Sequence, residues 1–291
     1  MKFIGVALFL ASCLMASPSS AQEVISLHGS GTTNPSKCYW TIMDQMNIQS
    51  KLPIRMTYRA VGSSTGQAEF IGNGTVSDNM FGSGDIPLSA EKYDAFEDST
   101  ILHLPVLLGA IAFFHSVPTG DERLNLSPCI LAKIFSRKIT DWGDDEIVQA
   151  NPNLSLPNPS PITVARRVKG SSSTASITKY LNQVCPDEWP AELVGKTIEW
   201  PSDTILCEGS GGMSDCIKDQ SGTIGYIDMG HGHAEGLAEI ELLNAAQKYI
   251  SSKEAALAGG IMAAAENAAL PDALEGSFAD VNLLNQVSCV S

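Results

Sequence analysis

The segments GSGTTNP at residues 29–35, GSSTG at residues 62–66 and GSSST at residues 170–174 share one composition, and together they decide the fold of this chain. Each segment follows a predicted strand and opens a predicted helix. The first turn of a helix presents unpaired backbone N–H groups and the positive end of the helix dipole, and glycine lets the backbone come close to a ligand. Arg166 and Arg167 precede the third segment, and the planar fork of arginine matches phosphate geometry. The sequence therefore predicts one site for a small oxyanion, with phosphate as the first candidate.

The regular elements around these segments predict layered α/β structure, because short apolar β-rich runs alternate with longer helical stretches. Strands are predicted at residues 24–28, 54–61, 162–165 and 223–227, and helices at residues 35–48, 67–71, 129–135, 175–184 and 245–270. Turns or loops are predicted at residues 85–89, 139–142, 151–161 and 209–213. The apolar run at residues 102–114 is predicted as a buried strand that crosses between two domains.

Composition limits the class of protein to which these segments belong. The chain has 291 residues, of which 44% are hydrophobic and 17% are charged, so it can bury a sizeable core in one large or two medium domains. Its formal net charge is −14 and its pI is about 4.7. An acidic chain of this kind is not expected to bind nucleic acid, which usually needs a basic face.

The N-terminus predicts export. Lys2 is followed by an apolar run at residues 3–11 and by small residues up to Ala21, so residues 1–21 are predicted as a signal peptide. An alternative is a lipoprotein acylated at Cys13, because the residues before it resemble a lipobox. No other apolar run approaches the about 20 residues that cross a membrane. The mature chain is therefore expected to be secreted, periplasmic or held at the cell surface.

Six cysteines follow the predicted signal peptide, and in an oxidising compartment they are expected to form disulfides: Cys38, Cys129, Cys185, Cys207, Cys216 and Cys289. Cys207 and Cys216 are close in sequence and form the pair we predict, whereas the pairing of the others stays open. Glycosylation sequons begin at Asn73, Asn125 and Asn153. These sequons fit the surface of a secreted protein and a eukaryotic source.

Six motifs occur in one order that is typical of a known family. They are GSGTTNP at 29–35, GSSTG at 62–66, FGSGDIPLS at 81–89, ITDW at 139–142, RRVKGSSST at 166–174 and GTIGY at 222–226. With these motifs the chain resembles the periplasmic phosphate-binding proteins of bacterial high-affinity phosphate uptake, over residues 24 to about 237. Each motif alone is generic, and their order carries the resemblance.

The resemblance implies an α/β fold of two hinged domains, the Venus flytrap of periplasmic binding proteins, with a mixed sheet flanked by helices in each domain. Domain one is expected to comprise residues 22–105 and 245–291, and domain two residues 106–244. The family continues beyond residues 281–291 with a further strand and helices, so the C-terminal part of domain one is expected to be incomplete.

The resemblance also assigns ligand-binding residues to both domains. Phosphate is expected to contact Thr33, Asn34, Ser63 and Asp85 from one side, and Arg167, Ser171, Ser172 and Ser173 from the other. Two positions depart from the family pattern. Asn34 stands where the family usually has an aromatic residue, and Lys169 stands where an acidic residue often restrains the arginine.

Asp85 gives the predicted site its selectivity. A carboxylate beside an anion is tolerable only when the ligand brings a proton that the carboxylate accepts. Phosphate at neutral pH carries such a proton and sulfate does not. Asp85 is therefore expected to reject sulfate, because two negative acceptors would face each other in a desolvated site.

Other functions fit the sequence less well. The close alternative is a binding protein for another oxyanion, sulfate or molybdate, and a distant one is a secreted phosphatase-like enzyme. We find no Gly-x-Ser-x-Gly elbow with a credible histidine partner, no Walker motif and no acidic cluster for two metals, so catalysis, cofactors and metals are not expected. His231 and His233 are predicted to lie in a surface turn. The expected partners of a monomeric chain are inorganic phosphate and, in a bacterium, the permease of an ABC transporter.

Overall fold

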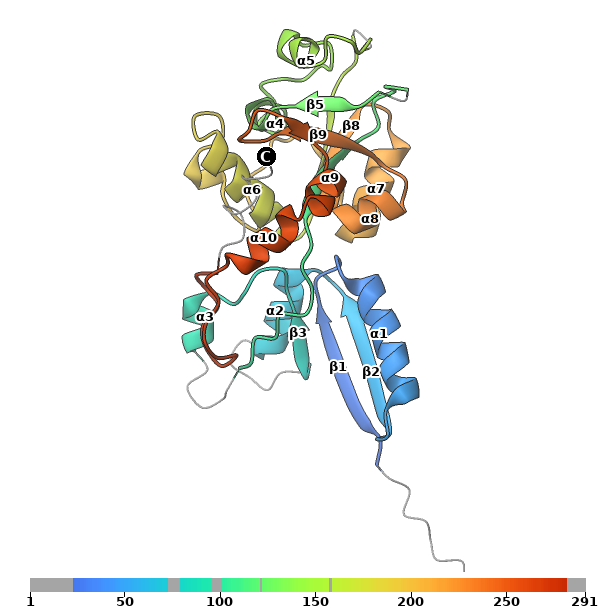
Figure 1. Cartoon of the computed structure of the whole chain (residues 1–291), viewed down its shortest axis with the longest axis vertical. Coiled ribbons are helices and arrows are strands. Elements are labelled where there is room, and N and C mark those ends of the chain that lie inside the picture. Colours follow the sequence, from blue (N-terminus) through green and yellow to red (C-terminus); the bar gives the residue numbers. More distant parts are fainter. Residues whose placement is uncertain (1–22, 73–78, 96–100, 121, 157–158, 282–291) are drawn as a thin grey trace, which may run out of the picture.

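A computed structural model describes residues 23–72, 79–95, 101–120, 122–156 and 159–281. The predicted signal peptide at residues 1–21, the acylation candidate Cys13, the sequon at Asn73 and Cys289 lie outside these residues. The described chain forms two lobes, each with a β-sheet flanked by helices (Figure 1). The predicted α/β class is therefore confirmed. Within the described residues no helix is both long and apolar enough to span a bilayer.

The smaller lobe contains a three-stranded sheet in the order β2-β1-β3, with all of its pairings parallel. Its elements are β1 (Ile25–Gly31), α1 (Ser36–Gln49), β2 (Ile54–Ala60), α2 (Ser63–Ile71), β3 (Phe81–Ser83) and α3 (Ala90–Asp94). Parallel strands end at the same edge of a sheet, so the segments that follow β1, β2 and β3 meet there. In Figure 1 the arrowheads of β1 and β2 point toward the larger lobe.

The larger lobe contains a mixed sheet in the order β10-β9-β4-β8-β6-β7, with β5 paired to β9. Strand β6 runs parallel to β7 and β8, whereas β4 runs antiparallel to β8 and β9. The strands are β4 (Ile111–His115), β5 (Leu124–Leu126), β6 (Thr163–Arg167), β7 (Ile205–Cys207), β8 (Thr223–Asp228), β9 (Ala238–Leu243) and β10 (Tyr249–Ile250). The helices are α4 (Pro128–Phe135), α5 (Asp145–Ala150), α6 (Ser172–Val184), α7 (Gly209–Asp219), α8 (Met229–Ala234), α9 (Ser252–Leu257) and α10 (Gly260–Glu266), with a 3-10 turn at Ala191–Leu193.

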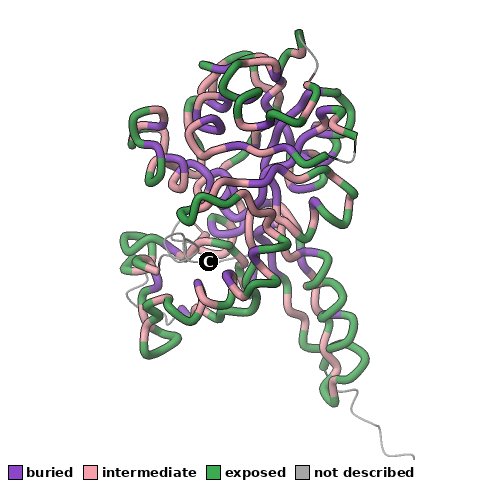
Figure 2. The backbone as a smooth tube through the Cα atoms, turned by 45° about the horizontal axis from the view of Figure 1, so that its top comes forward, coloured by how far each residue is buried: buried purple, intermediate pink, exposed green. Residues whose placement is uncertain are grey.

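The main hydrophobic core lies in the larger lobe, where most of the buried chain is found (Figure 2). Its largest fully buried side chains include Trp142, Trp189, Tyr226 and Phe114. The indole N–H of Trp142 donates to the carbonyl of Gly222 at 2.9 Å, so this buried ring leaves no polar atom unpaired. The larger lobe therefore forms a rigid base for the residues at the edge of its sheet.

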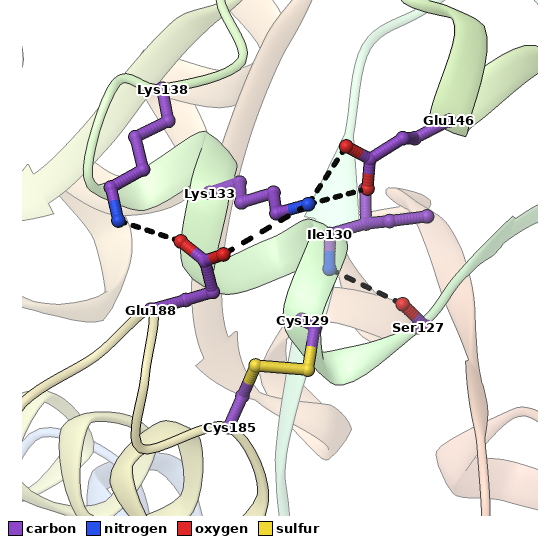
Figure 3. The surroundings of a disulfide bond; sticks show 8 residues. All are labelled: Ser127, Cys129, Ile130, Lys133, Lys138, Glu146, Cys185 and Glu188. Atoms are coloured by element: carbon purple, nitrogen blue, oxygen red, sulfur yellow. Dashed lines mark hydrogen bonds and ion pairs between the residues drawn. A yellow bond between two sulfur atoms is a disulfide. The ribbon is translucent and has the colours of Figure 1, made fainter.

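Two disulfides lie in the larger lobe. Cys129–Cys185 joins α4 to the end of α6, and Figure 3 shows it beside Lys133, whose ammonium lies 2.7 Å from Glu146. Cys207–Cys216 joins the end of β7 to α7, which confirms the predicted pair. Cys38 on α1 is an exposed free thiol in the described chain.

The prediction of a buried strand at residues 102–114 is wrong for its first part. Only Ile111–His115 form a strand, and the side chains of Leu104, Val106 and Leu107 are more than half exposed. Pro105 has no N–H to donate to a neighbouring strand, and residues 101–110 cross between the lobes without forming a strand. The apolar residues before Ile111 therefore belong to the connection between the lobes and not to a β-sheet.

Three other predictions of local structure are wrong. Residues 209–213 open helix α7 and are not a turn. Gly209 enters the helix with a φ of 67°, and the fully buried side chain of Met213 anchors the first turn in the core. His231 and His233 lie in the short helix α8, not in a turn. Residues 245–270 form β10 and two short helices, because Gly259 with a φ of 81° separates α9 from α10 despite the helix propensity of alanine.

The expected division of the chain into residues 22–105 with 245–291, and residues 106–244, stays a prediction. In the structure β10 pairs with β9, and Glu254 on α9 contacts Arg123 at 2.8 Å, so this stretch packs on the larger sheet. Farther on, the backbone N–H of His103 donates to the carbonyl of Leu274, and Phe278 packs on the ring of His103. The C-terminal stretch therefore returns to the smaller lobe beside α3.

Gly66 on α2 tests how closely this helix packs on β1. A Cβ at Gly66 would overlap the backbone of Gly31, so Gly66→Ala is expected to lower the free energy of unfolding by about 1–3 kcal/mol, as overpacking does. Gly211 on α7 is the matched control, because a Cβ there meets nothing within 4 Å. Gly211→Ala should leave stability unchanged or raise it. Urea unfolding measures the free energy of unfolding of both variants. An equal change in the two variants would contradict the close packing of α2 on β1.

His115 makes the stability of the fold depend on pH. Burial lowers the pKa of this histidine to about 4, while its Nδ1 accepts the N–H of Val117 at 3.1 Å. The unfolded chain, with a histidine pKa of about 6.5, takes up the proton first, so stability is lost as the pH falls from 6.5 to 4. His115→Gln should reduce this loss by about 2–4 kcal/mol in urea unfolding at several pH values. An unchanged slope in His115→Gln would contradict the assignment.

Candidate functional site

The first turns of four helices face one another where the two lobes meet. Helices α1 and α2 belong to the smaller lobe, and α6 and α7 to the larger one. The predicted helices at 67–71 and 175–184 in fact begin earlier, at Ser63 and Ser172, inside the glycine-serine segments. Gly62 precedes α2 with a φ of 93°, a conformation that favours glycine. Converging helix starts place unpaired N–H groups and positive dipole ends around one point, which favours an anion.

Arg167 is the charged group of this site. It ends strand β6, is only 7% exposed, and its Nε finds no hydrogen-bond partner among the described residues. No carboxylate in the described chain lies within ion-pair distance of its guanidinium. Burial lowers the pKa of this arginine from its ordinary value, because the charged form is desolvated. The neighbouring Arg166 is half-buried and contacts Thr204 instead.

Two acidic side chains, Asp85 and Glu208, act on the charge of Arg167 from a distance, and neither forms an ion pair with it among the described residues. Glu208 precedes α7, and its carboxylate forms an ion pair with Lys169, two residues after the arginine. This pair lowers the pKa of Glu208. The lysine that departs from the family pattern therefore takes the carboxylate of Glu208 as its own ion-pair partner. A buried cation without a counter-ion is costly, so the site is arranged for an anion from outside the chain.

Asp85 collects donors from both lobes on one carboxylate oxygen. Its Oδ2 accepts from the hydroxyl of Thr32 at 2.5 Å and from the amide of Asn34 at 3.0 Å. The hydroxyl oxygen of Ser63, whose single proton is directed to Ser172, lies 3.4 Å from the same Oδ2. The hydroxyl of Ser172, on the other lobe, also donates to it. Asp85 as a residue is exposed, so the expectation of a desolvated carboxylate is wrong for this structure.

The remaining hydroxyls connect the lobes directly. The hydroxyl of Ser63 donates to that of Ser172 at 2.9 Å, and the amide of Asn34 donates to Ser173 at 3.4 Å. Ser171 has another role, because its hydroxyl caps α6 by accepting the N–H of Ser173 at 3.1 Å. Its own backbone N–H donates to the carbonyl of Lys196.

The structure thus brings most of the predicted site residues into one network. Asn34, Ser63, Asp85, Ser172 and Ser173 are linked by hydrogen bonds, and Thr33 reaches the network through Ser210. The guanidinium of Arg167 lies close to Gly62, at 3.8 Å from the place that a Cβ there would occupy. Ser171 serves the helix cap that orients Ser173.

Sequence reasoning missed two members of the network, Thr32 and Ser210. Both are 2% exposed. Thr32 lies in the first glycine-serine segment, next to the threonine that was assigned. Ser210 lies in the sequence GSGG at residues 209–212, which matches the composition of the other three segments and was interpreted as a turn. The described residues hold no cluster of His, Cys, Asp and Glu suited to a metal ion.

Comparison with known families agrees with this geometry. A family model described as PBP superfamily domain matches residues 16–281, which is more than half of the chain. The chain belongs to the PBP superfamily. The expected two-domain α/β fold agrees with that of a solved structure, a high affinity periplasmic phosphate-binding protein (PfluDING) bound with phosphate. That structure is 20% identical, has a TM-score of 0.64, and is matched over 85% of this chain and 68% of its own.

Curated relatives within the PBP superfamily carry the name phosphate-binding protein PstS. The one from Haemophilus influenzae is 29% identical over 229 residues, which cover 77% of this chain and 64% of that protein. The one from Methanocaldococcus jannaschii is 28% identical over 238 residues, which cover 78% of this chain and 59% of that protein. The chain therefore spans about three fifths of these relatives, and the resemblance to phosphate-binding proteins that the motifs predicted is confirmed.

Replacing Arg167 tests whether its charge is uncompensated. In a buffer without phosphate or sulfate, Arg167→Met should raise the free energy of unfolding by about 1–3 kcal/mol, because an apolar chain of similar length replaces a buried unpaired cation. Arg166→Met, at the half-buried neighbour, is the control and should change stability by less than about 0.5 kcal/mol. Urea unfolding measures both, and a loss of stability in Arg167→Met would show that the protein itself neutralises this charge.

Proposed function

We propose that this protein binds inorganic phosphate between its two lobes outside the cytoplasm, and does not catalyse a reaction. The observation that carries the proposal is the buried guanidinium of Arg167, whose Nε has no partner in the described chain, at the meeting point of four helix starts. A guanidinium fork and converging N–H groups are donors only, and they suit a ligand that offers acceptors on every side. The names of the curated relatives support phosphate as that ligand.

In this proposal the two lobes contribute different donors to one phosphate. Thr33, Asn34 and Ser63 belong to the smaller lobe, and Arg167, Ser172 and Ser173 to the larger lobe, with Ser171 fixing the first turn of α6. The hinge is formed by the two segments that connect the lobes, residues 102–110 and the C-terminal stretch after α10. Closure of the lobes replaces the water shell of the ligand with fixed hydrogen-bond donors. The hydrogen bonds from Ser63 to Ser172 and from Lys196 to Gln67, at 2.9 Å each, are contacts of the closed arrangement.

Asp85 is proposed to select the protonated anion. All of its hydrogen bonds with described residues fall on Oδ2, so Oδ1 stays available to accept a proton from the ligand. Phosphate offers that proton at neutral pH, and sulfate does not. The exposure of Asp85 weakens the repulsion of sulfate by solvent screening, so discrimination is expected to be smaller than for a fully buried carboxylate.

The cellular setting is part of the same proposal. The signal-like residues 1–21 place the protein in the periplasm, at the cell surface or in the medium. In a bacterium its partner would be the permease of an ABC transporter for phosphate, which receives the ligand from a monomeric binding protein. In a eukaryote the sequons would fit a secreted scavenger.

A phosphatase or serine hydrolase fits the geometry less well. Residues 62–66 do match the pattern Gly-x-Ser-x-Gly at the start of α2, with Ser64 in the place of the nucleophile in its first turn. Within the described chain, however, no histidine forms a hydrogen bond with Ser64. A serine without a base is a weak nucleophile.

Calorimetric titration with phosphate, and separately with sulfate, tests the proposal. The wild-type chain is expected to bind phosphate at least about 100-fold more tightly than sulfate, because a mismatched pair of acceptors costs several kcal/mol. Asp85→Asn should narrow this ratio by about tenfold or more. The control is Lys51→Gln, an exposed position beyond the C-terminal end of α1, and it should leave the ratio of the two affinities unchanged. Folded wild-type protein that binds neither anion would refute the proposal, and tight sulfate binding would favour the other oxyanions.

A further inference from the structure

Helix α7 is tied to the anion site by a covalent bond. Cys207, the last residue of β7, is 1% exposed and forms a disulfide with Cys216 on α7. The bond therefore encloses the whole first turn of the helix, including Ser210. Strand β7 runs beside β6 with Cys207 opposite Arg167, and the carbonyl of Cys207 accepts the N–H of Val168 at 3.1 Å. The disulfide thus fixes the start of α7 relative to the strand that carries the buried arginine.

Ser210 reaches from this first turn to the other lobe. It is 2% exposed, and its hydroxyl donates to the amide oxygen of Asn34 at 3.2 Å. Because that hydroxyl has a single proton, the contact with Thr33 at 2.8 Å is a bond in which Thr33 donates. Ser210 therefore contacts both residues at which the first glycine-serine segment was expected to meet the ligand.

The bond from Ser210 and the bond to Asp85 hold the side-chain amide of Asn34 in one orientation, each from one end of the amide. With Oδ1 occupied by Ser210, the Nδ2 group donates to Asp85 at 3.0 Å and to Ser173 at 3.4 Å. A turned amide would place an oxygen against the carboxylate of Asp85, which is unfavourable. Where the related proteins usually carry an aromatic ring, this chain has an amide that needs a partner to hold its orientation.

We propose that Ser210 is a positioning residue of the anion site, which orients Asn34 across the two lobes and is itself held in place by the Cys207–Cys216 disulfide. This inference rests on the proposed function, because it assigns a role within the same site. The buried, unpartnered Nε of Arg167 beside this turn is the independent sign that a ligand binds here. The contact joins the lobes only when they are closed, so its loss should favour the open arrangement and weaken binding.

Phosphate titration of single and double variants tests the role of Ser210. Ser210→Ala should weaken phosphate binding about threefold to tenfold, the range of one hydrogen bond. Asn34→Ala should have a similar or larger effect, and Ser210→Ala added to Asn34→Ala should cost less than twofold more, because the two residues act through one contact. Fully multiplicative losses would show that Ser210 does not act through Asn34.

The disulfide is tested in the same titration. Cys207→Ser with Cys216→Ser should weaken phosphate binding by a similar factor, and by less than twofold when Ser210 is already alanine. The control is Cys129→Ser with Cys185→Ser, which removes the disulfide between α4 and the far end of α6 and should stay within twofold of wild type. Should the first pair not fold, Ser210→Ala in the protein with both disulfides decides the proposal.

The outcomes separate this inference from the proposed function. No phosphate binding by folded wild-type protein would overturn the function and the inference together. Phosphate binding by wild type that is unchanged in Ser210→Ala would overturn the inference alone. Equal losses in the two disulfide variants would show that the bonds act through general stability, and would overturn the role of Cys207–Cys216.

Discussion

The structure of the site depends on one unfavourable interaction, the burial of the Arg167 guanidinium without a counter-ion. Strand β6 carries this side chain to the edge of the larger sheet, where the rigid core around Trp142 and Tyr226 prevents it from turning to solvent. Of the two acidic residues that act on it, Glu208 is engaged by Lys169, and Asp85 accepts hydrogen bonds from Thr32, Asn34 and Ser172. Neither carboxylate forms an ion pair with the guanidinium in the described chain. This arrangement favours an anion as the partner of the guanidinium, which is the basis of the proposed function.

The two lobes differ in how firmly they hold their residues. The larger lobe has a continuous core and two disulfides, whereas the smaller lobe buries few apolar side chains and exposes Trp40, Ile42 and Met46 on α1. The site residues of the smaller lobe are positioned by parallel strands that end at one edge of its sheet and by hydrogen bonds to the larger lobe. Asn34 and Asp85 therefore depend on the closed arrangement more than Arg167 and Ser171 do.

Much of this could be predicted from the sequence, because helix starts have local signatures. Glycine and serine after a β-rich run predicted a strand-to-helix junction at three of the four places in the site, although α2 and α6 begin three to four residues earlier than expected. A resemblance of ordered motifs assigned Arg167 and Asp85. The fourth helix start, at Gly209, was missed because GSGG without a preceding long strand also describes a turn. The exposed crossing at residues 102–110 was missed because apolar composition does not say whether a strand finds a neighbour. The exposure of Asp85 depends on the distance between the lobes, which no local pattern encodes.

The most direct test of the account is the NMR signal of the Arg167 Nε–H during titration with phosphate, assigned by its loss in Arg167→Met. We predict a large downfield shift and slower exchange with water as phosphate saturates the site, because this N–H gains its first hydrogen-bond partner. The Arg166 signal should stay in place. A folded protein in which the Arg167 signal does not change while phosphate binds would show that the anion lies elsewhere, and would contradict the central role of this guanidinium.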